Sequence, residues 1–159
     1  MLNLLKLLGN AAVNSVLEAH VASPHKKIKK GAARAEAEEY IRAKYAAGAF
    51  VEKAGMSGED LDLALWKCCR SGDAAGAMKF LAWGADAGHA NTEERGGTCL
   101  HAVVESNPEF ALECIELLTV NGADVNAVDG DENSVLDAAV ARNEGTVVAF
   151  IVAKIENAV

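Results

Sequence analysis

A short motif occurs twice in this chain, and its spacing restricts the fold more than any other feature. Gly84-Ala85-Asp86 recurs 38 positions later as Gly122-Ala123-Asp124, and each copy follows an apolar stretch of helical periodicity. Thr98 to Ala102 is related to Ser134 to Ala138 at a spacing of 36 positions. A period in the thirties with two short helices and a glycine turn is typical of stacked repeats. The sequence therefore predicts an all-α solenoid.

These segments resemble the ankyrin repeat. Thr98-Cys99-Leu100-His101-Ala102 is similar to its T-P-L-H-x-A box, with cysteine in place of proline, and Asn121 to Asn126 is similar to its exit turn. The resemblance implies three repeats, at about 59–88, 94–126 and 127–159. The residues expected to have structural roles in the repeats are Thr98, Leu100, His101, Gly84, Asp86, Gly122, Asp124 and Asn126.

The outer repeats depart from the box, as terminal repeats commonly do. In the first repeat Leu63 to Trp66 occupies the box region, and in the third Asp137 stands where the box has histidine. The box histidine of the middle repeat, His101, is expected to bond Thr98 and nearby backbone, which argues against a catalytic role. The acidic segment 129–133 superficially resembles a calcium loop, but the glutamate that ends such a loop is missing, so we expect a turn between repeats.

Two further helices are predicted ahead of the repeats, over residues 4–19 and about 34–47, from apolar residues that recur every three to four positions. A loop with one proline and a run of lysines separates them. Neither helix has enough partners to form a domain alone, so we expect both to pack on the repeats.

These N-terminal helices resemble the second half of an ArfGAP domain, which stimulates GTP hydrolysis by Arf GTPases. The first is similar to that domain's L-G-N-x-x-x-N-x-x-x-E-A helix, and the second to its closing I-x-A-K-Y-x-x-x-x-F segment. The matching positions are Gly9, Asn10, Asn14, Glu18, Ile41, Ala43, Lys44, Tyr45 and Phe50. An ArfGAP domain followed by ankyrin repeats is similar to the ACAP-type family. The resemblance implies a two-helix ArfGAP remnant over 1–55, packed on repeats over 59–159.

The catalytic parts of an ArfGAP domain have no counterpart here. That domain begins with a C-x2-C-x16-C-x2-C zinc finger and a following arginine, which contributes roughly 10³–10⁵ to hydrolysis. None of the five arginines aligns with that residue, and all four cysteines lie in the repeats without C-x-x-C spacing. We expect buried thiols, no metal and no cofactor in this chain, with zinc only in full-length members. The resemblance thus implies a truncated relative that is not an enzyme or an active GAP by itself.

Charge is divided unevenly along the chain. Residues 1–55 carry nine Lys or Arg against five Asp or Glu, whereas residues 56–159 carry six against eighteen. The acidic total argues against a nucleic-acid partner. The basic cluster Lys26, Lys27, Lys29 and Lys30 is a candidate for weak contact with anionic lipid, at about 1 kcal/mol per lysine, and a solvated loop is the alternative. Trp66 and Trp83 are candidate partner contacts, with core or junction packing as the alternative.

Two functions remain open from the sequence. In the first, the chain belongs to an ArfGAP-family protein that regulates Arf-type small GTPases in membrane traffic. In the second, it is a protein-interaction module or scaffold with no GTPase-related role. Either function fits a cytoplasmic protein, peripheral at membranes if the lysine loop binds lipid, because no apolar run approaches the roughly 18 residues of a membrane span.

Overall fold

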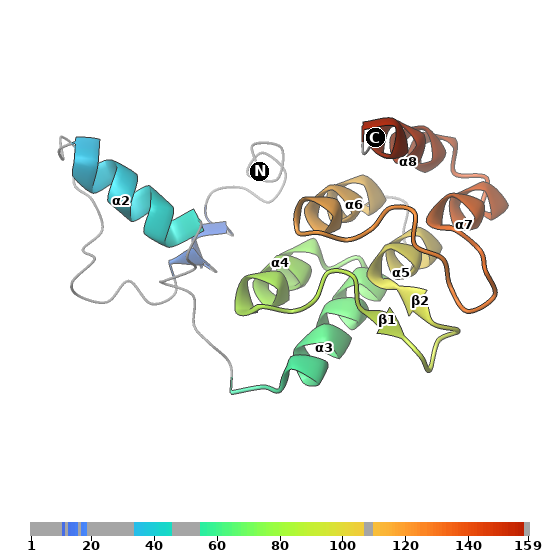
Figure 1. The fold of residues 1–159 in the computed structure, drawn as a ribbon, viewed down its shortest axis with the longest axis horizontal. Coiled ribbons are helices and arrows are strands. Elements are labelled where there is room, and N and C mark those ends of the chain that lie inside the picture. Colours follow the sequence, from blue (N-terminus) through green and yellow to red (C-terminus); the bar gives the residue numbers. More distant parts are fainter. Residues whose placement is uncertain are drawn as a thin grey trace.

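The computed structural model describes residues 11, 13–15, 17, 18, 34–45, 55–106 and 110–157 (Figure 1). These residues are mostly helical, with one two-stranded sheet. The predicted all-α class and the presence of stacked helical repeats are confirmed. No helix in the described ranges is both long and apolar enough to cross a membrane.

Six helices form three consecutive pairs, which we call repeats 1, 2 and 3. They are α3 (Gly58–Ser71) with α4 (Ala74–Trp83), α5 (Cys99–Ser106) with α6 (Ala111–Val120), and α7 (Val135–Ala141) with α8 (Gly145–Asn157). The first helices of the pairs contact one another in the order α3, α5, α7, and the second helices in the order α4, α6, α8. The pairs therefore stack in chain order into two rows of helices (Figure 1).

Short polar and glycine residues set the ends of these helices. The Ser57 hydroxyl accepts the Asp60 N–H and begins α3, and the Asp73 carboxylate accepts the Gly76 N–H at 2.8 Å and begins α4. Gly72 and Gly84 end α3 and α4 with φ of 74° and 101°, a left-handed backbone that glycine adopts without strain. The Gly-Ala-Asp motif thus marks the exit from the second helix of a repeat.

Two finger-like turns project between the pairs. In the first, β1 (Ala90–Asn91) pairs antiparallel with β2 (Gly97–Thr98), and in the second Val128 bridges to Ser134. The fingers contact each other through the backbone, since the Gly130 N–H donates to the Arg95 carbonyl at 2.6 Å. A Cβ at Gly130 would lie 2.6 Å from that carbonyl oxygen, so only glycine permits this approach.

One continuous core runs through the three repeats. Leu65, Leu100, Ile115, Leu118 and Ile151 are fully buried in it. Because each helix pair contacts the neighbouring pair through both rows of helices, the repeats stabilise one another and none buries its apolar face alone.

The N-terminal segment contributes to this core. Helical residues occur at 11, 13–15 and 17, and α2 spans Arg34–Tyr45, within the predicted range of about 34–47. Val13 belongs to the buried core cluster of the repeats, and Leu17 packs against it. Tyr40 of α2 is also buried. The first predicted helix therefore packs on the repeats at Val13.

Candidate functional site

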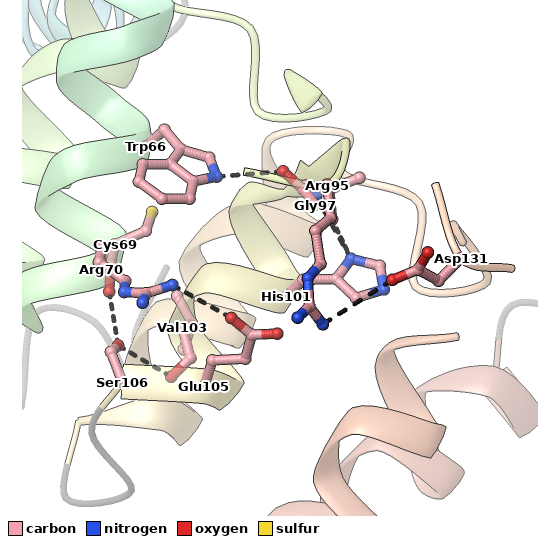
Figure 2. Close-up of polar contacts among 11 residues, drawn as sticks. Trp66, Cys69, Arg70, Arg95, Gly97, His101, Val103, Glu105, Ser106 and Asp131 are labelled. Atoms are coloured by element: carbon pink, nitrogen blue, oxygen red, sulfur yellow. Dashed lines mark hydrogen bonds and ion pairs between the residues drawn. The ribbon is translucent and has the colours of Figure 1, made fainter. Parts of the chain in front are cut away.

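A ring N–H from one repeat reaches the finger of the next, at equivalent positions in repeats 1 and 2, and Figure 2 shows the bond made by Trp66. The Trp66 indole N–H donates to the Gly97 carbonyl at 3.1 Å. His101 lies 35 positions after Trp66, and its Nε2 is 3.0 Å from the Asn133 carbonyl. The first repeat, which lacks the sequence box, therefore places tryptophan where the box has histidine. The sequence placed Trp66 in the box region, but it did not predict the bond from its indole to the next finger.

The partners of His101 fix its tautomer. The backbone N–H of Thr98 can only donate and lies 3.3 Å from His101 Nδ1, while the Asn133 carbonyl can only accept. Nδ1 is therefore the acceptor, Nε2 carries the hydrogen, and the Thr98 hydroxyl at 2.8 Å donates to Nδ1. The ring is 2% exposed with both nitrogens bonded, so His101 connects repeats 2 and 3, as a structural residue would.

Asp137 takes the histidine position in repeat 3 and has a different role. Its carboxylate accepts the Ser134 N–H at 2.9 Å, and the Ser134 hydroxyl accepts the Asp137 N–H at 3.1 Å, which closes a capping box at the start of α7. The bonds from Ser134 lower the pKa of Asp137. Among the described residues no finger follows repeat 3, so an inter-repeat donor has no acceptor there.

A groove lies between the fingers and the first helices of the repeats. One hollow of about 270 Å³ is lined by Trp66, Arg70, Glu94, Arg95, Gly97, His101, Ala102, Glu105 and Asp129. A second, of about 430 Å³, is lined by Arg70, Arg95, Glu105, Asp129, Asn133, Asp137, Ala138, Ala141 and Arg142. The four residues common to both hollows are Arg70, Arg95, Glu105 and Asp129. The hollows therefore form one surface along all three repeats, which we call the groove.

Charged side chains of both signs line the groove (Figure 2). Arg70 pairs with Glu105 at 3.1 Å and lies 5.7 Å from the ring centre of Trp66. Arg95 lies 3.8 Å from Asp131 and keeps 80% of its side chain exposed. Arg142 is exposed at the end of α7. Exposed pairs of this kind contribute little to stability, so these side chains can exchange partners on binding.

Asp129 holds the second finger together. Its Oδ1 accepts the N–H groups of Asp131 and Asn133 at 2.9 and 2.8 Å. Desolvation acts to raise the pKa of Asp129, but the bonds from Asn133 and Asp131 outweigh it and lower that pKa. The carboxylate is engaged by amides of its own turn, so the acidic segment 129–133 forms a turn between repeats.

The other turn residues expected from the repeat pattern lie at the bases of the fingers. Asp86 accepts the Gly88 N–H and Asp124 accepts the Asn126 N–H, each at 2.9 Å. Gly122 has φ of 98°, as Gly84 has 101°. These residues shape the loops that carry the groove.

The remaining predicted contacts lie outside this groove. Trp83 is half-buried on α4, with Lys79 Nζ 4.4 Å from its ring centre and Phe80 edge-on to it. Gly9, Asn10, Phe50 and the four lysines of the 26–30 run lie outside the described residues, and for Ile41, Lys44 and Tyr45 only the helical backbone is described. Asn14 and Glu18 are one turn apart on a helix, the Glu18 N–H donating to the Asn14 carbonyl.

The four cysteines are free thiols inside the repeats. Cys69, Cys99 and Cys114 are buried and Cys68 is partly so. Burial raises the pKa of Cys68 to about 11, helped by Asp73, and that of Cys114 to about 12. A bond to Cys99 and burial also raise the pKa of Cys69. Within the described ranges no three His, Cys, Asp or Glu side chains are placed to hold a metal ion, so these thiols do not fit the zinc of an ArfGAP finger.

Sequence reasoning named Trp66 as a candidate contact but did not identify the charged lining of the groove. Arg70, Arg95, Glu105 and Arg142 were absent from the expected contacts, because isolated charges on short helices resemble any solvated face. Two of them could have been found by their spacing: Arg70 and Glu105 are 35 positions apart, the same interval that separates Trp66 from His101.

Comparisons with known proteins support the repeat and suggest a relative. The family model for the ankyrin repeat matches residues 95–130. The ARF GTPase-activating protein Git of Drosophila melanogaster is 29% identical over 150 residues, which cover 87% of this chain. The chain spans about a fifth of the length of that relative.

Proposed function

We propose that this chain is a protein-interaction module from a protein of the ArfGAP type with ankyrin repeats, and that it binds an Arf-type small GTPase in the groove. The observation that carries the proposal is the continuous groove along three repeats, rimmed by arginines and acidic residues. Such a surface suits a folded protein partner with polar, charged loops, because complementary charges give specificity and a fast encounter.

The ArfGAP part of the proposal rests on two supports. The N-terminal segment resembles the closing helices of an ArfGAP domain, and Git, with a distant but long similarity, carries that activity in its name. The ACAP-type assignment rests on the sequence resemblance alone, while the similarity to Git supports the wider family. A peripheral position at membranes, through the lysine run, belongs to the same proposal.

This chain by itself binds the GTPase without accelerating hydrolysis. Acceleration needs a fixed cation against the charge that develops on the transferred phosphoryl group. The groove arginines are exposed, the ion pairs of Arg70 and Arg95 are exposed as well, and three of the four thiols are buried inside the repeats. We therefore expect no zinc-dependent site and no arginine finger to form from residues 1–159.

The test combines hydrolysis and binding with the full chain. Single-turnover GTP hydrolysis by an Arf-type GTPase is measured with and without the chain, and we expect equal rates. Affinity for the GTPase carrying a GTP analogue is then compared for the wild type, Arg142→Ala and Lys79→Ala, a control on α4 outside the groove. We expect Arg142→Ala to weaken binding about fivefold or more and Lys79→Ala to leave it within about twofold.

The outcomes separate the two functions that the sequence left open. Faster hydrolysis with the chain would overturn the proposal that it lacks GAP activity. An absence of binding to any Arf-type GTPase would favour an interaction module with no GTPase-related role. Equal weakening of binding by Arg142→Ala and Lys79→Ala would show that the groove is not the binding site.

A further inference from the structure

The outward side of repeat 3 has the apolar residues of an internal repeat, and among the described residues Val140 and Val152 on that side are exposed. In α5, Leu100 and Val104 are 0% and 2% exposed, and α7 packs on that helix. The equivalent residues of α7 are Leu136, which is partly exposed, and Val140, which is 59% exposed. Residues at these positions of an internal repeat pack on its neighbour, and repeat 3 has the same apolar residue types there.

The second helix of repeat 3 also has apolar residues on its outward side. Val147 and Ile151 of α8 are buried, as Cys114 and Leu118 of α6 are. The next stripe around α8 is also apolar, and Val152 on it is 37% exposed. Spacings of three and four residues place this stripe on one face of the helix. We call the five residues Leu136, Val140, Val148, Val152 and Ile155 the end face.

The end face is distinct from the groove. On α7 the residues that line the groove are Asp137, Ala138 and Ala141, whereas Leu136 and Val140 lie on the adjoining stripe. On α8, Lys154 pairs with Glu116 of repeat 2, which orients that side of the helix toward the stack. The end face therefore points away from repeat 2, where a following repeat would pack.

Charge around the end face indicates what could cover it. Residues 127–157 carry six Asp or Glu against two Lys or Arg, but Asp129, Asp137 and Arg142 line the groove and Asp131 pairs with Arg95. Of the other charges, Lys154 is already paired with Glu116, which leaves Glu132, Glu144 and Glu156. Glu156 follows Val152 by one helical turn, and Glu132 and Glu144 lie in the turns at the two ends of α7. Two copies of this face would repel each other, whereas a cationic partner would be attracted.

We propose that the end face of repeat 3 is a docking surface for an amphipathic helix of another protein, one with an apolar stripe flanked by lysine or arginine. The two apolar stripes of α7 and α8 offer the ridges on which such a helix packs, as α7 and α8 themselves pack on repeat 2. This surface would serve a second partner, separate from the one in the groove, so it does not depend on the proposed binding of a GTPase.

The test uses the full chain and a synthetic 18-residue helix of leucine, alanine and lysine with its leucines on one face. Binding is measured by fluorescence anisotropy for the wild type, Val140→Glu and Val152→Glu, with Val120→Glu as the control. Val120 is a valine of α6 that is 54% exposed and lies outside the end face. All three variants add one negative charge at an exposed site, so the melting temperature should change little.

We expect the two end-face variants to weaken binding about tenfold or more and the control to leave it within about threefold. Because the added charge attracts lysine, only a loss of apolar contact explains weakening. Equal affinities for all four proteins would overturn the proposal, as would equally tight binding of a peptide with glutamate in place of lysine. A dimer of the chain alone that Val140→Glu dissociates would assign the face to a second copy instead.

Discussion

Replacing His101 with leucine tests whether ring N–H groups couple the repeats. Leucine fills similar space but removes the acceptor for the Thr98 N–H and the donor to the Asn133 carbonyl. The two hydrogen bonds are worth about 1 kcal/mol each, and leaving the buried Thr98 N–H without an acceptor adds about 1 kcal/mol or more. The expected loss is about 3 kcal/mol, a large part of the stability of a small domain.

Urea and thermal unfolding followed by circular dichroism measure this loss. At about 2–4 °C per kcal/mol for a chain of this size, the melting temperature should fall by about 6–12 °C. Asp137→Leu is the matched control, because Asp137 occupies the same position in repeat 3, is exposed, and bonds only within its own capping box. Its loss should be less than half as large. If His101→Leu costs under about 1 kcal/mol, or no more than Asp137→Leu, the coupling inferred here is wrong.

Gly130, the four thiols and Asp129 can each be tested by a single measurement. Gly130→Ala should lower stability by about 1–3 kcal/mol in urea unfolding, since its Cβ would meet a backbone oxygen, while Gly145→Ala, with open space around it, should be neutral or stabilising. The thiols should react with Ellman's reagent far more slowly in the native chain than in urea, because burial keeps the pKa of Cys68 at about 11; a rapid native reaction would contradict this. Folding lowers the pKa of Asp129, so the ionised carboxylate contributes to the free energy of unfolding above the unfolded pKa of 3.8, and this contribution is lost as the pH falls through the lower folded pKa. Asp129→Asn should therefore destabilise the chain more at neutral pH than in strong acid. Equal losses of stability at the two pH values would refute this.

The repeat architecture could be predicted because its signals are local. Gly84 and Gly122 hold a left-handed turn that few other residues adopt, so the motif marks each exit from a second helix. Thr98 and His101 are three residues apart and bond each other within one turn. Patterns of this kind need no knowledge of the rest of the chain.

The groove and the end face depend on how repeats are placed relative to one another. Trp66 replaces a histidine in function only because its indole reaches Gly97, 31 residues away. Val104 and Val140 have the same residue type at equivalent positions, yet one is buried and the other is 59% exposed, because only one has a following repeat among the described residues. No local pattern distinguishes them.

In the proposed function, the groove binds an Arf-type GTPase without stimulating hydrolysis. The most direct measurement is an amide NMR titration of the ¹⁵N-labelled chain with an unlabelled Arf-type GTPase that carries a GTP analogue. We expect the amide signals that shift to belong to the fingers and to α3, α5 and α7, including those of Arg70, Arg95 and Arg142. Signals that stay unchanged throughout, or shifts confined to the second helices α4, α6 and α8, would contradict the account.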